Sequence, residues 1–221
     1  MPPTSIAAND PYFRNILFNN WSGQPEGLTY QRAISALENY GHVAEVTLIG
    51  KKLLDAITFT KKITQQFDPF TAEQNGADGY GPTILSVLEY YSRRYGVYPK
   101  NDTIHFNGLP AAKAHAYTQK IDNGCYKLVQ KNGQLTGFCN SREISRSTAG
   151  VKVMTDKAGN CLALAGIDTL VQTVYLTIKG KRYSGQVKPN GWYGFAKGKI
   201  KLLKQVPFNY PYQDVDKRSE F

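Results

Sequence analysis

The chain has 221 residues, of which 41% are hydrophobic, and 27 Lys/Arg against 17 Asp/Glu give it a formal net charge of +10. This length suits one large or two modest domains with a substantial core. The absence of a long apolar run excludes a transmembrane helix. The first ten residues lack the basic and apolar regions of a signal peptide, so localisation stays open, and we expect a cytoplasmic protein if the chain is complete.

Three apolar stripes at helical spacing predict helices over residues 26–40, 42–66 and 82–95. Gly41 and Gly96 follow the first and third stripes, where glycine commonly ends a helix. Because one glycine separates the first two stripes, we expect them to form an antiparallel helical hairpin.

Beyond residue 100 the pattern changes to short alternating runs separated by glycine-containing turns. Strands at this spacing predict an antiparallel β-sandwich. The predicted fold class is therefore α+β, with a helical domain at 1–99, a β-sandwich domain at 100–207 and a flexible tail at 208–221.

The three cysteines have no metal-ligand spacing, and we expect small buried apolar residues without a disulfide. A two-residue turn at Asn132–Gly133 would pair residue 126 with residue 139. The side chains of Cys125 and Cys139 would then point to opposite faces of the ribbon.

Positive charge belongs to the second half of the chain. Residues 1–99 carry 8 Lys/Arg and 9 Asp/Glu, whereas residues 100–221 carry 19 and 8. We interpret the excess positive charge as lysines on solvated strand faces, where they also block edge pairing, and favour this over an acidic partner. No nucleic-acid motif is present, and we expect neither a nucleic-acid nor a membrane partner.

Four motifs occur in a fixed order along the first half of the chain: Asp10-Pro11-Tyr12, Asn20-Trp21-Ser22-Gly23-Gln24-Pro25, Tyr40-Gly41-His42 and Gly79-Tyr80-Gly81-Pro82. This order resembles the C-terminal hairpins of six-hairpin (α/α)6-barrel glycoside hydrolases, nearest to the mannosylglycerate-hydrolase-like and α-glucosidase/trehalase-like families. The resemblance implies that residues 1–99 are the last hairpins of an α/α toroid. It also implies an O-glycosyl hydrolase, or the C-terminal portion of one.

In the families that the chain resembles, a glutamate in a loop after such a hairpin is the catalytic base, and Glu73 occupies that place. Inverting hydrolysis needs a second carboxyl group about 6.5–9.5 Å away. Glu26 is the candidate for that second carboxylate, or for a residue that orients Glu73. Asp78 would raise the basicity of Glu73 if the two lie close together. The family's general acid has no counterpart here, so we expect this chain alone to be incomplete and inactive.

The predicted substrate-binding residues are those whose side chains can stack on a sugar or hydrogen-bond its hydroxyl groups: Trp21, Gln24, Tyr30, Gln31, Asp78 and Tyr80. No metal or cofactor is expected. The expected partners are a carbohydrate substrate and, over the open helical face, a missing N-terminal part or a second copy. The alternative function is a non-catalytic carbohydrate- or polyanion-binding module that uses the basic β-domain.

Overall fold

The computed structural model describes residues 25–68, 73–148 and 150–208. These divide into two compact units. The first holds the described residues of Met1–Ala36 and Ile49–Tyr90, and the second holds those of Leu37–Leu48 and Tyr91–Phe208. Within the described residues, none of the helices has the length and hydropathy needed to cross a membrane.

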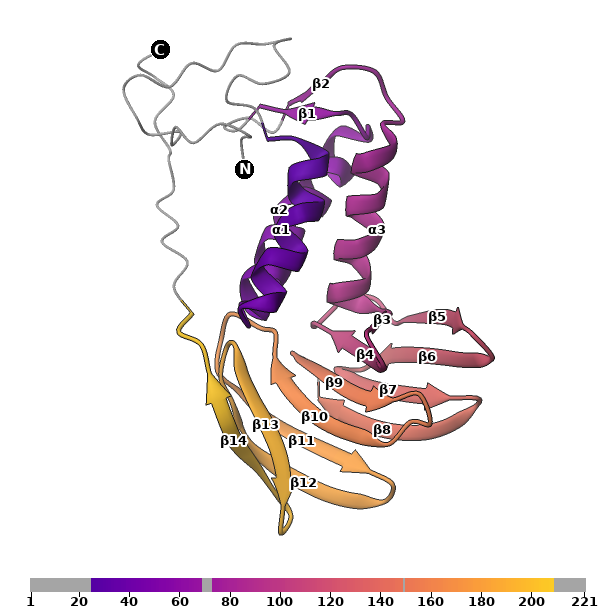
Figure 1. Ribbon diagram of the computed structural model, residues 1–221, viewed down its shortest axis with the longest axis vertical. Coiled ribbons are helices and arrows are strands. Elements are labelled where there is room, and N and C mark those ends of the chain that lie inside the picture. Colours follow the sequence, from indigo (N-terminus) through magenta and orange to yellow (C-terminus); the bar gives the residue numbers. More distant parts are fainter. Residues whose placement is uncertain (1–24, 69–72, 149, 209–221) are drawn as a thin grey trace. The chain divides into compact units, whose positions relative to one another are not determined.

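Three helices and fourteen strands form the described part of the chain (Figure 1). The helices are α1 (Gly27–Asn39), α2 (Val43–Thr60) and α3 (Gly81–Tyr95). Two short strands lie between α2 and α3, namely β1 (Gln66–Phe67) and β2 (Gln74–Asn75). The remaining strands are β3 (Val97–Lys100), β4 (Thr103–Gly108), β5 (His115–Ile121), β6 (Gly124–Lys131), β7 (Gln134–Cys139), β8 (Arg142–Thr148), β9 (Val151–Asp156), β10 (Cys161–Gly166), β11 (Gln172–Ile178), β12 (Lys181–Val187), β13 (Gly191–Ala196) and β14 (Lys199–Gln205).

Close helix contacts build the first unit. A side chain at Gly27 would collide with Thr83 on α3, and one at Gly50 would collide with the ring of Tyr90. The Tyr90 hydroxyl donates to the carbonyl of Tyr30 at 2.9 Å. Glycine at these two positions therefore lets α1 and α2 approach α3 closely.

The second unit is one continuous twelve-stranded sheet with the order β3-β4-β9-β10-β13-β14-β12-β11-β8-β7-β6-β5. Its neighbours are antiparallel except β12 and β14, which pair in parallel through Ser184 and Lys199 alone. The sheet curls on itself, so that its terminal strands β3 and β5 lie side by side (Figure 1).

The interior of the curled sheet is a single apolar core that receives residues from both halves of the strand order. Phe106 on β4 meets Tyr126 on β6 with ring centroids 6.4 Å apart. Gly108 on β4 lies so close to Leu135 on β7 that an added Cβ would overlap its side chain.

The start of α2 is fixed to the β-rich unit by hydrogen bonds. Asn190, in the turn before β13, accepts from the backbone nitrogen of Ala44 at 2.8 Å and donates to Glu45 at 2.7 Å. Thr47 donates to the carbonyl of Ile167 at 2.6 Å. Val43 also packs in one apolar cluster with Met154 of β9, and the amide of Asn107 on β4 donates to the carbonyl of Ser92 in α3. Helix ends therefore cover the outer face of β4 and β9, which are buried on both faces.

The predicted fold class is wrong. The chain is β-rich, and its strands β3 to β14 form one curled sheet, whereas a sandwich consists of two separate sheets packed face to face. The predicted helical hairpins of an α/α toroid, and with them the six-hairpin architecture, are contradicted by the three short helices. The second helix is also shorter than predicted. Lys61 has a φ of 58° and α2 ends at Thr60, whereas the apolar stripe predicted a helix as far as Gln66.

Local turn predictions are confirmed. Gly41 has a φ of 85° and follows α1. Asn132 and Gly133 have φ values of 51° and 71°, as a two-residue hairpin turn requires. Residue 126 pairs with Cys139, and all three cysteines are free, but only Cys139 is buried, whereas Cys125 and Cys161 are half-buried.

Candidate functional site

The carboxylates predicted to be catalytic lie at the small β1–β2 sheet of the first unit. Glu26 forms an isolated bridge with Gln66 of β1, and Gln66 pairs with Asn75 of β2. Glu73 immediately precedes β2, where its carbonyl accepts from the backbone nitrogen of Asp68 at 2.7 Å. The backbones that carry the two acids therefore lie on either side of β1.

These two acids differ in their surroundings. Glu26 is 4% exposed, and its carboxylate accepts from the amide of Gln65 at 3.2 Å. Glu73 is exposed. Trp21 and Gln24, predicted to line the sugar site, lie outside the described residues.

Of the other predicted site residues, most have structural contacts. The Tyr30 ring lies edge-on to Phe67 and Tyr90, with both centroid distances 6.3 Å. Gln31 donates to Glu89 at 3.1 Å. These contacts show how α1 packs, and neither brings Tyr30 or Gln31 to Glu73.

Asp78 and Tyr80 organise the loop before α3. The Asp78 carboxylate accepts from the backbone nitrogens of Ile63 at 2.7 Å and Gly79 at 2.9 Å. These two backbone donors lower the pKa of Asp78. The carbonyl of Tyr80 accepts from the nitrogens of Thr83 and Ile84 in the first turn of α3.

A cluster of buried charges in the second unit was not predicted. Glu38, at the end of α1, faces three cations: Lys100 at 3.1 Å, and Arg93 and Lys152 each at 3.5 Å. Tyr98 on β3 connects them, because its hydroxyl donates to Glu38 at 2.6 Å and accepts from Lys152 at 2.7 Å. The guanidinium of Arg93 also lies 4.0 Å from the centre of the Tyr98 ring.

The pKa values in this cluster follow from burial and from the excess of cations. Burial raises the pKa of Glu38, but Lys152, Arg93, Tyr98 and Lys100 together outweigh it and lower that pKa to about 2. Burial lowers the pKa of Lys152 to about 8, against the opposing effect of Glu38. Glu38 therefore stays ionised near neutral pH, which suits it to hold cations in place and not to donate a proton.

His105 on β4 adds a neutral ring to the cluster. Burial, with the Lys152 cation as the next cause, lowers its pKa to about 3. A chain of contacts runs from Glu38 through Tyr98 (2.6 Å), His105 (3.2 Å) and Thr103 (2.8 Å) to the carbonyl of Lys100 (2.6 Å).

This chain has four links but only three hydrogens, one each from the tyrosine, the neutral imidazole and the threonine. The longest link is the one between Tyr98 and His105, so we assign the missing hydrogen there. The imidazole hydrogen then lies on Nε2 and is donated to Thr103.

A pocket of about 420 Å³ opens beside this cluster. Its wall includes the polar side chains of Glu38, Lys100, Thr103, His105, Lys152 and Lys204, and the aromatic rings of Tyr40 and Trp192. Tyr40 is 77% exposed. This volume is within the usual range of small-molecule sites.

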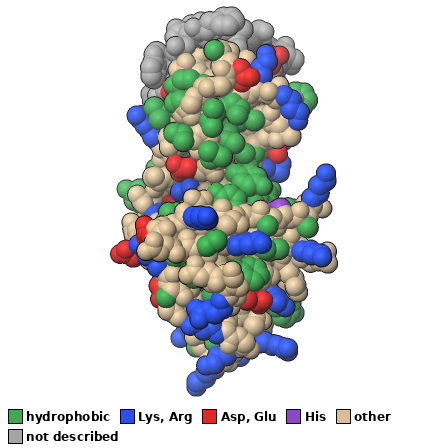
Figure 2. Space-filling view, turned by 90° about the vertical axis from the view of Figure 1, so that its right-hand side faces the viewer, with side chains coloured by type: hydrophobic (Ala, Val, Ile, Leu, Met, Phe, Trp, Pro, Cys, Tyr) green, Lys and Arg blue, Asp and Glu red, His purple; other side chains and the backbone are tan. Residues whose placement is uncertain are grey.

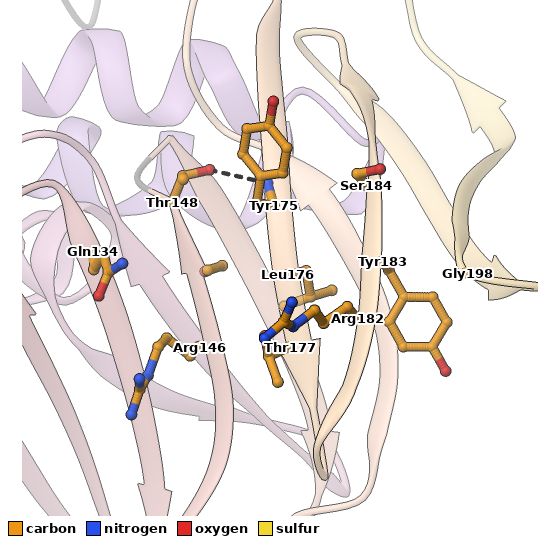
Figure 3. Close-up of a pocket in the computed structure, with 11 residues that line it drawn as sticks. Gln134, Arg146, Thr148, Tyr175, Leu176, Thr177, Arg182, Tyr183, Ser184 and Gly198 are labelled. Atoms are coloured by element: carbon orange, nitrogen blue, oxygen red, sulfur yellow. Dashed lines mark hydrogen bonds between the residues drawn. The ribbon is translucent and has the colours of Figure 1, made fainter.

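A second hollow, of about 400 Å³, lies on strands β8, β11 and β12 (Figure 3). Leu176 on β11 is buried, so its neighbours Tyr175 and Thr177 point to the opposite, outer face. Thr177 pairs with Arg146 on one side and with Arg182 on the other. The two arginines therefore flank one threonine in a row across three strands.

The upper part of this hollow carries neutral polar groups and an aromatic ring. Thr148 accepts from the backbone nitrogen of Tyr175 at 3.4 Å, and Ser184 pairs directly with Tyr175 on the next strand (Figure 3). The Tyr175 side chain is 64% exposed. An exposed aromatic ring beside several hydrogen-bonding groups is suited to a ligand that is apolar on one face and polar at its edge.

Within the described part of the chain, no group of three or more His, Cys, Asp or Glu could hold a metal ion. Comparisons with known proteins add no relative, because no family model, curated protein or solved structure matches the chain. The functional interpretation of these sites therefore rests on their geometry alone.

Proposed function

We propose that the chain is a carbohydrate-binding protein and that its β-rich unit holds the saccharide in the hollow on β8, β11 and β12. The observation that supports this is the exposed Tyr175 ring beside the row Arg146–Thr177–Arg182. A pyranose presents C–H groups on its face and hydroxyl groups around its edge. The tyrosine ring packs on the first, and guanidinium and hydroxyl groups hydrogen-bond the second.

Charge distribution favours a neutral saccharide over a polyanion in this hollow. Arg146 is already paired with Glu143 at 2.7 Å. On the face that Figure 2 shows, Lys and Arg side chains are scattered over the strands and do not form one continuous stripe. A polyanion-binding surface would gather its cations along a track.

Titration calorimetry with neutral oligosaccharides tests this proposal. The probes are the hexasaccharides of maltose, cellobiose and mannobiose type, with heparin as the polyanion. We expect at least one neutral hexasaccharide to bind and Tyr175→Ala to weaken that binding about tenfold, the loss of about 1.4 kcal/mol that removing a stacking ring produces. Arg182→Ala should weaken it as well.

Arg142→Ala is the matched control, because Arg142 lies on β8 but does not line the hollow. It should leave the binding of neutral sugar unchanged. The proposal fails if no neutral oligosaccharide binds. It also fails if heparin alone binds and Arg142→Ala weakens that binding as much as Arg182→Ala does.

As a second candidate we propose glycoside hydrolysis with Glu73 as general base. The observation that favours it is that Glu26 and Glu73 lie on backbones flanking β1. Neighbouring strands are about 4.8 Å apart, so two backbones on either side of one strand are about 10 Å apart. This is a separation between backbones, so the two side chains would have to turn toward each other to bring their carboxyl groups within the about 6.5–9.5 Å of inverting enzymes.

The hydrolase candidate is tested with the protein at its natural full length, using 4-nitrophenyl α-glucoside and α-mannoside. Glu73→Gln should lower kcat by about a thousandfold or more while the protein stays folded. Glu143→Gln, an exposed acid on β8, is the control and should leave turnover unchanged. Absence of turnover in the unaltered protein, or full turnover in Glu73→Gln, contradicts this candidate.

A further inference from the structure

The pocket beside the Glu38 cluster carries more positive charge than its acids compensate. Glu38 is the only acidic residue among the described side chains that line it. Lys100, Lys152 and Lys204 also line it, and Arg93 lies 3.5 Å from the Glu38 carboxylate. One carboxylate facing this number of cations leaves a positive potential in a partly desolvated hollow.

The exposed cations of the pocket lie beside aromatic surface. The Nζ atom of Lys204 lies 5.1 Å from the Trp192 ring. Lys100 keeps 30% of its side chain exposed, so its ammonium can contact a ligand as well as Glu38. The pocket can therefore contact both an anionic group and an apolar face of one ligand.

An unused donor gives a second, independent indication of a ligand. The indole nitrogen of Trp192 is buried and has no hydrogen-bond partner among the described residues. Gly41, with a φ of 85°, also lines the pocket, and a Cβ there would lie 3.8 Å from this nitrogen. A buried donor without a partner costs about 1–3 kcal/mol, and a ligand oxygen removes that cost if the ring turns to present the nitrogen to the pocket.

We propose that this pocket is a second saccharide site, specific for an acidic sugar. Lys100 and Lys204 receive the carboxylate, and the rings of Trp192 and Tyr40 contact the pyranose. Lys152, held by Glu38 and Tyr98, adds to the positive potential from within. This inference rests on the proposed carbohydrate binding, but it assigns a different site and a different class of sugar.

The test is a calorimetric and NMR titration of the whole chain with glucuronate, glucose and acetate. Glucuronate should bind, whereas glucose lacks the charge and acetate lacks the ring, so both should bind at least about tenfold more weakly. Lys204→Ala should weaken glucuronate binding about tenfold. Lys201→Ala is the control, since it removes the same charge from the same strand outside the pocket.

The outcomes separate this inference from the function on which it rests. Loss of glucuronate binding in Lys204→Ala, with Lys201→Ala and Tyr175→Ala unchanged, supports it. Equal weakening in both lysine variants, equal binding of acetate or glucose, or absence of glucuronate binding overturns it. If glucuronate fails while a neutral oligosaccharide still depends on Tyr175, the acidic-sugar site is refuted and the proposed function stands.

Discussion

The ammonium of Lys152 donates a hydrogen bond to the hydroxyl oxygen of Tyr98 at 2.7 Å, although the Lys152 side chain is only 3% exposed. A cation so deeply buried needs both an opposite charge and a hydrogen-bond acceptor. Glu38 provides the first and Tyr98 the second. The hydroxyl therefore links the helix residue Glu38 to the strand residue Lys152.

Tyr98→Phe tests how much that link contributes. The change removes an acceptor from Lys152 and a donor from Glu38 while the ring keeps its volume. We expect a loss of about 3 kcal/mol or more in the free energy of unfolding, because two hydrogen bonds to charged groups are removed and each is worth about 1.5–3 kcal/mol. Urea unfolding followed by tryptophan fluorescence measures this.

Tyr175→Phe is the control for that experiment, since the Tyr175 side chain is 64% exposed. It should change stability by less than about 0.5 kcal/mol. Equal stability of Tyr98→Phe and the unaltered protein would show that Lys152 does not depend on this hydroxyl.

Glu38→Gln should be more damaging, because it leaves Arg93, Lys100 and Lys152 together without their carboxylate. Removing one partner of a buried ion pair costs about 3–5 kcal/mol. The pKa of Glu38 is about 2 in the fold against an ordinary 4.5, so the unfolded chain binds the proton first as pH falls. The stabilisation by Glu38 is thus complete above pH 4.5 and lost between pH 4.5 and about 2.

The measurement is the difference in unfolding free energy between the unaltered protein and Glu38→Gln at several pH values. That difference should shrink as pH falls through this window. Asp55→Asn, which breaks the exposed pair with Lys51, should cost less than about 1 kcal/mol at every pH. A difference that stays constant down to pH 2 would contradict the proposed charge balance.

Local signals in the sequence predicted local structure well. Gly41 and the turn at Asn132–Gly133 were found because the required positive φ is specific to those residue types. The Glu38 cluster was missed because Glu38 and Lys152 are distant in sequence from the segment 93–105 that holds the other members. Glu38 and Lys152 are 114 residues apart.

The order of the strands could not be predicted for a related reason. Local alternation identifies a strand and its two faces, but it does not specify which strand becomes its neighbour. The pairing of β10 with β13, and the single pair between β12 and β14, depend on how the whole sheet curls. On β9 the sequence signal for the cluster was Lys152, a charged residue between apolar residues in a strand that is buried on both faces.

His105 gives a second dependence on pH. Its pKa is about 3 in the fold against an ordinary 6.5, because burial and the Lys152 cation oppose a charge on the ring. As pH falls from 6.5 towards 3, His105 binds a proton in the unfolded chain but stays neutral in the folded chain. Stability therefore falls through this window, and it is fully retained only above about pH 6.5.

Two-dimensional NMR of the histidine ring carbons checks this directly. The His105 signal should keep its neutral position down to about pH 4. In Lys152→Met the signal should titrate at a higher pH, because the cation that lowers the pKa of His105 most has been removed. A midpoint near 6.5 in the unaltered protein would show that the ring is not buried as described.

The curled sheet makes a prediction at Gly108, whose backbone faces the side chain of Leu135 on the opposite half of the sheet. A Cβ at Gly108 would lie 2.1 Å from one Leu135 methyl carbon and 2.5 Å from the other. Leu135 is only 3% exposed and has little room to move. Gly108→Ala should therefore destabilise the protein by about 1–3 kcal/mol, the usual cost of overpacking a core.

A double-mutant cycle identifies the cause. Leu135→Ala alone should cost about 2–5 kcal/mol, but together with Gly108→Ala the loss should be smaller than the sum, because the truncated side chain leaves room for the new methyl group. Gly81→Ala is the control, since a Cβ there meets no atom within 4 Å. Unfolding in urea gives all four free energies, and strict additivity would mean that β4 and β7 do not face each other across the core.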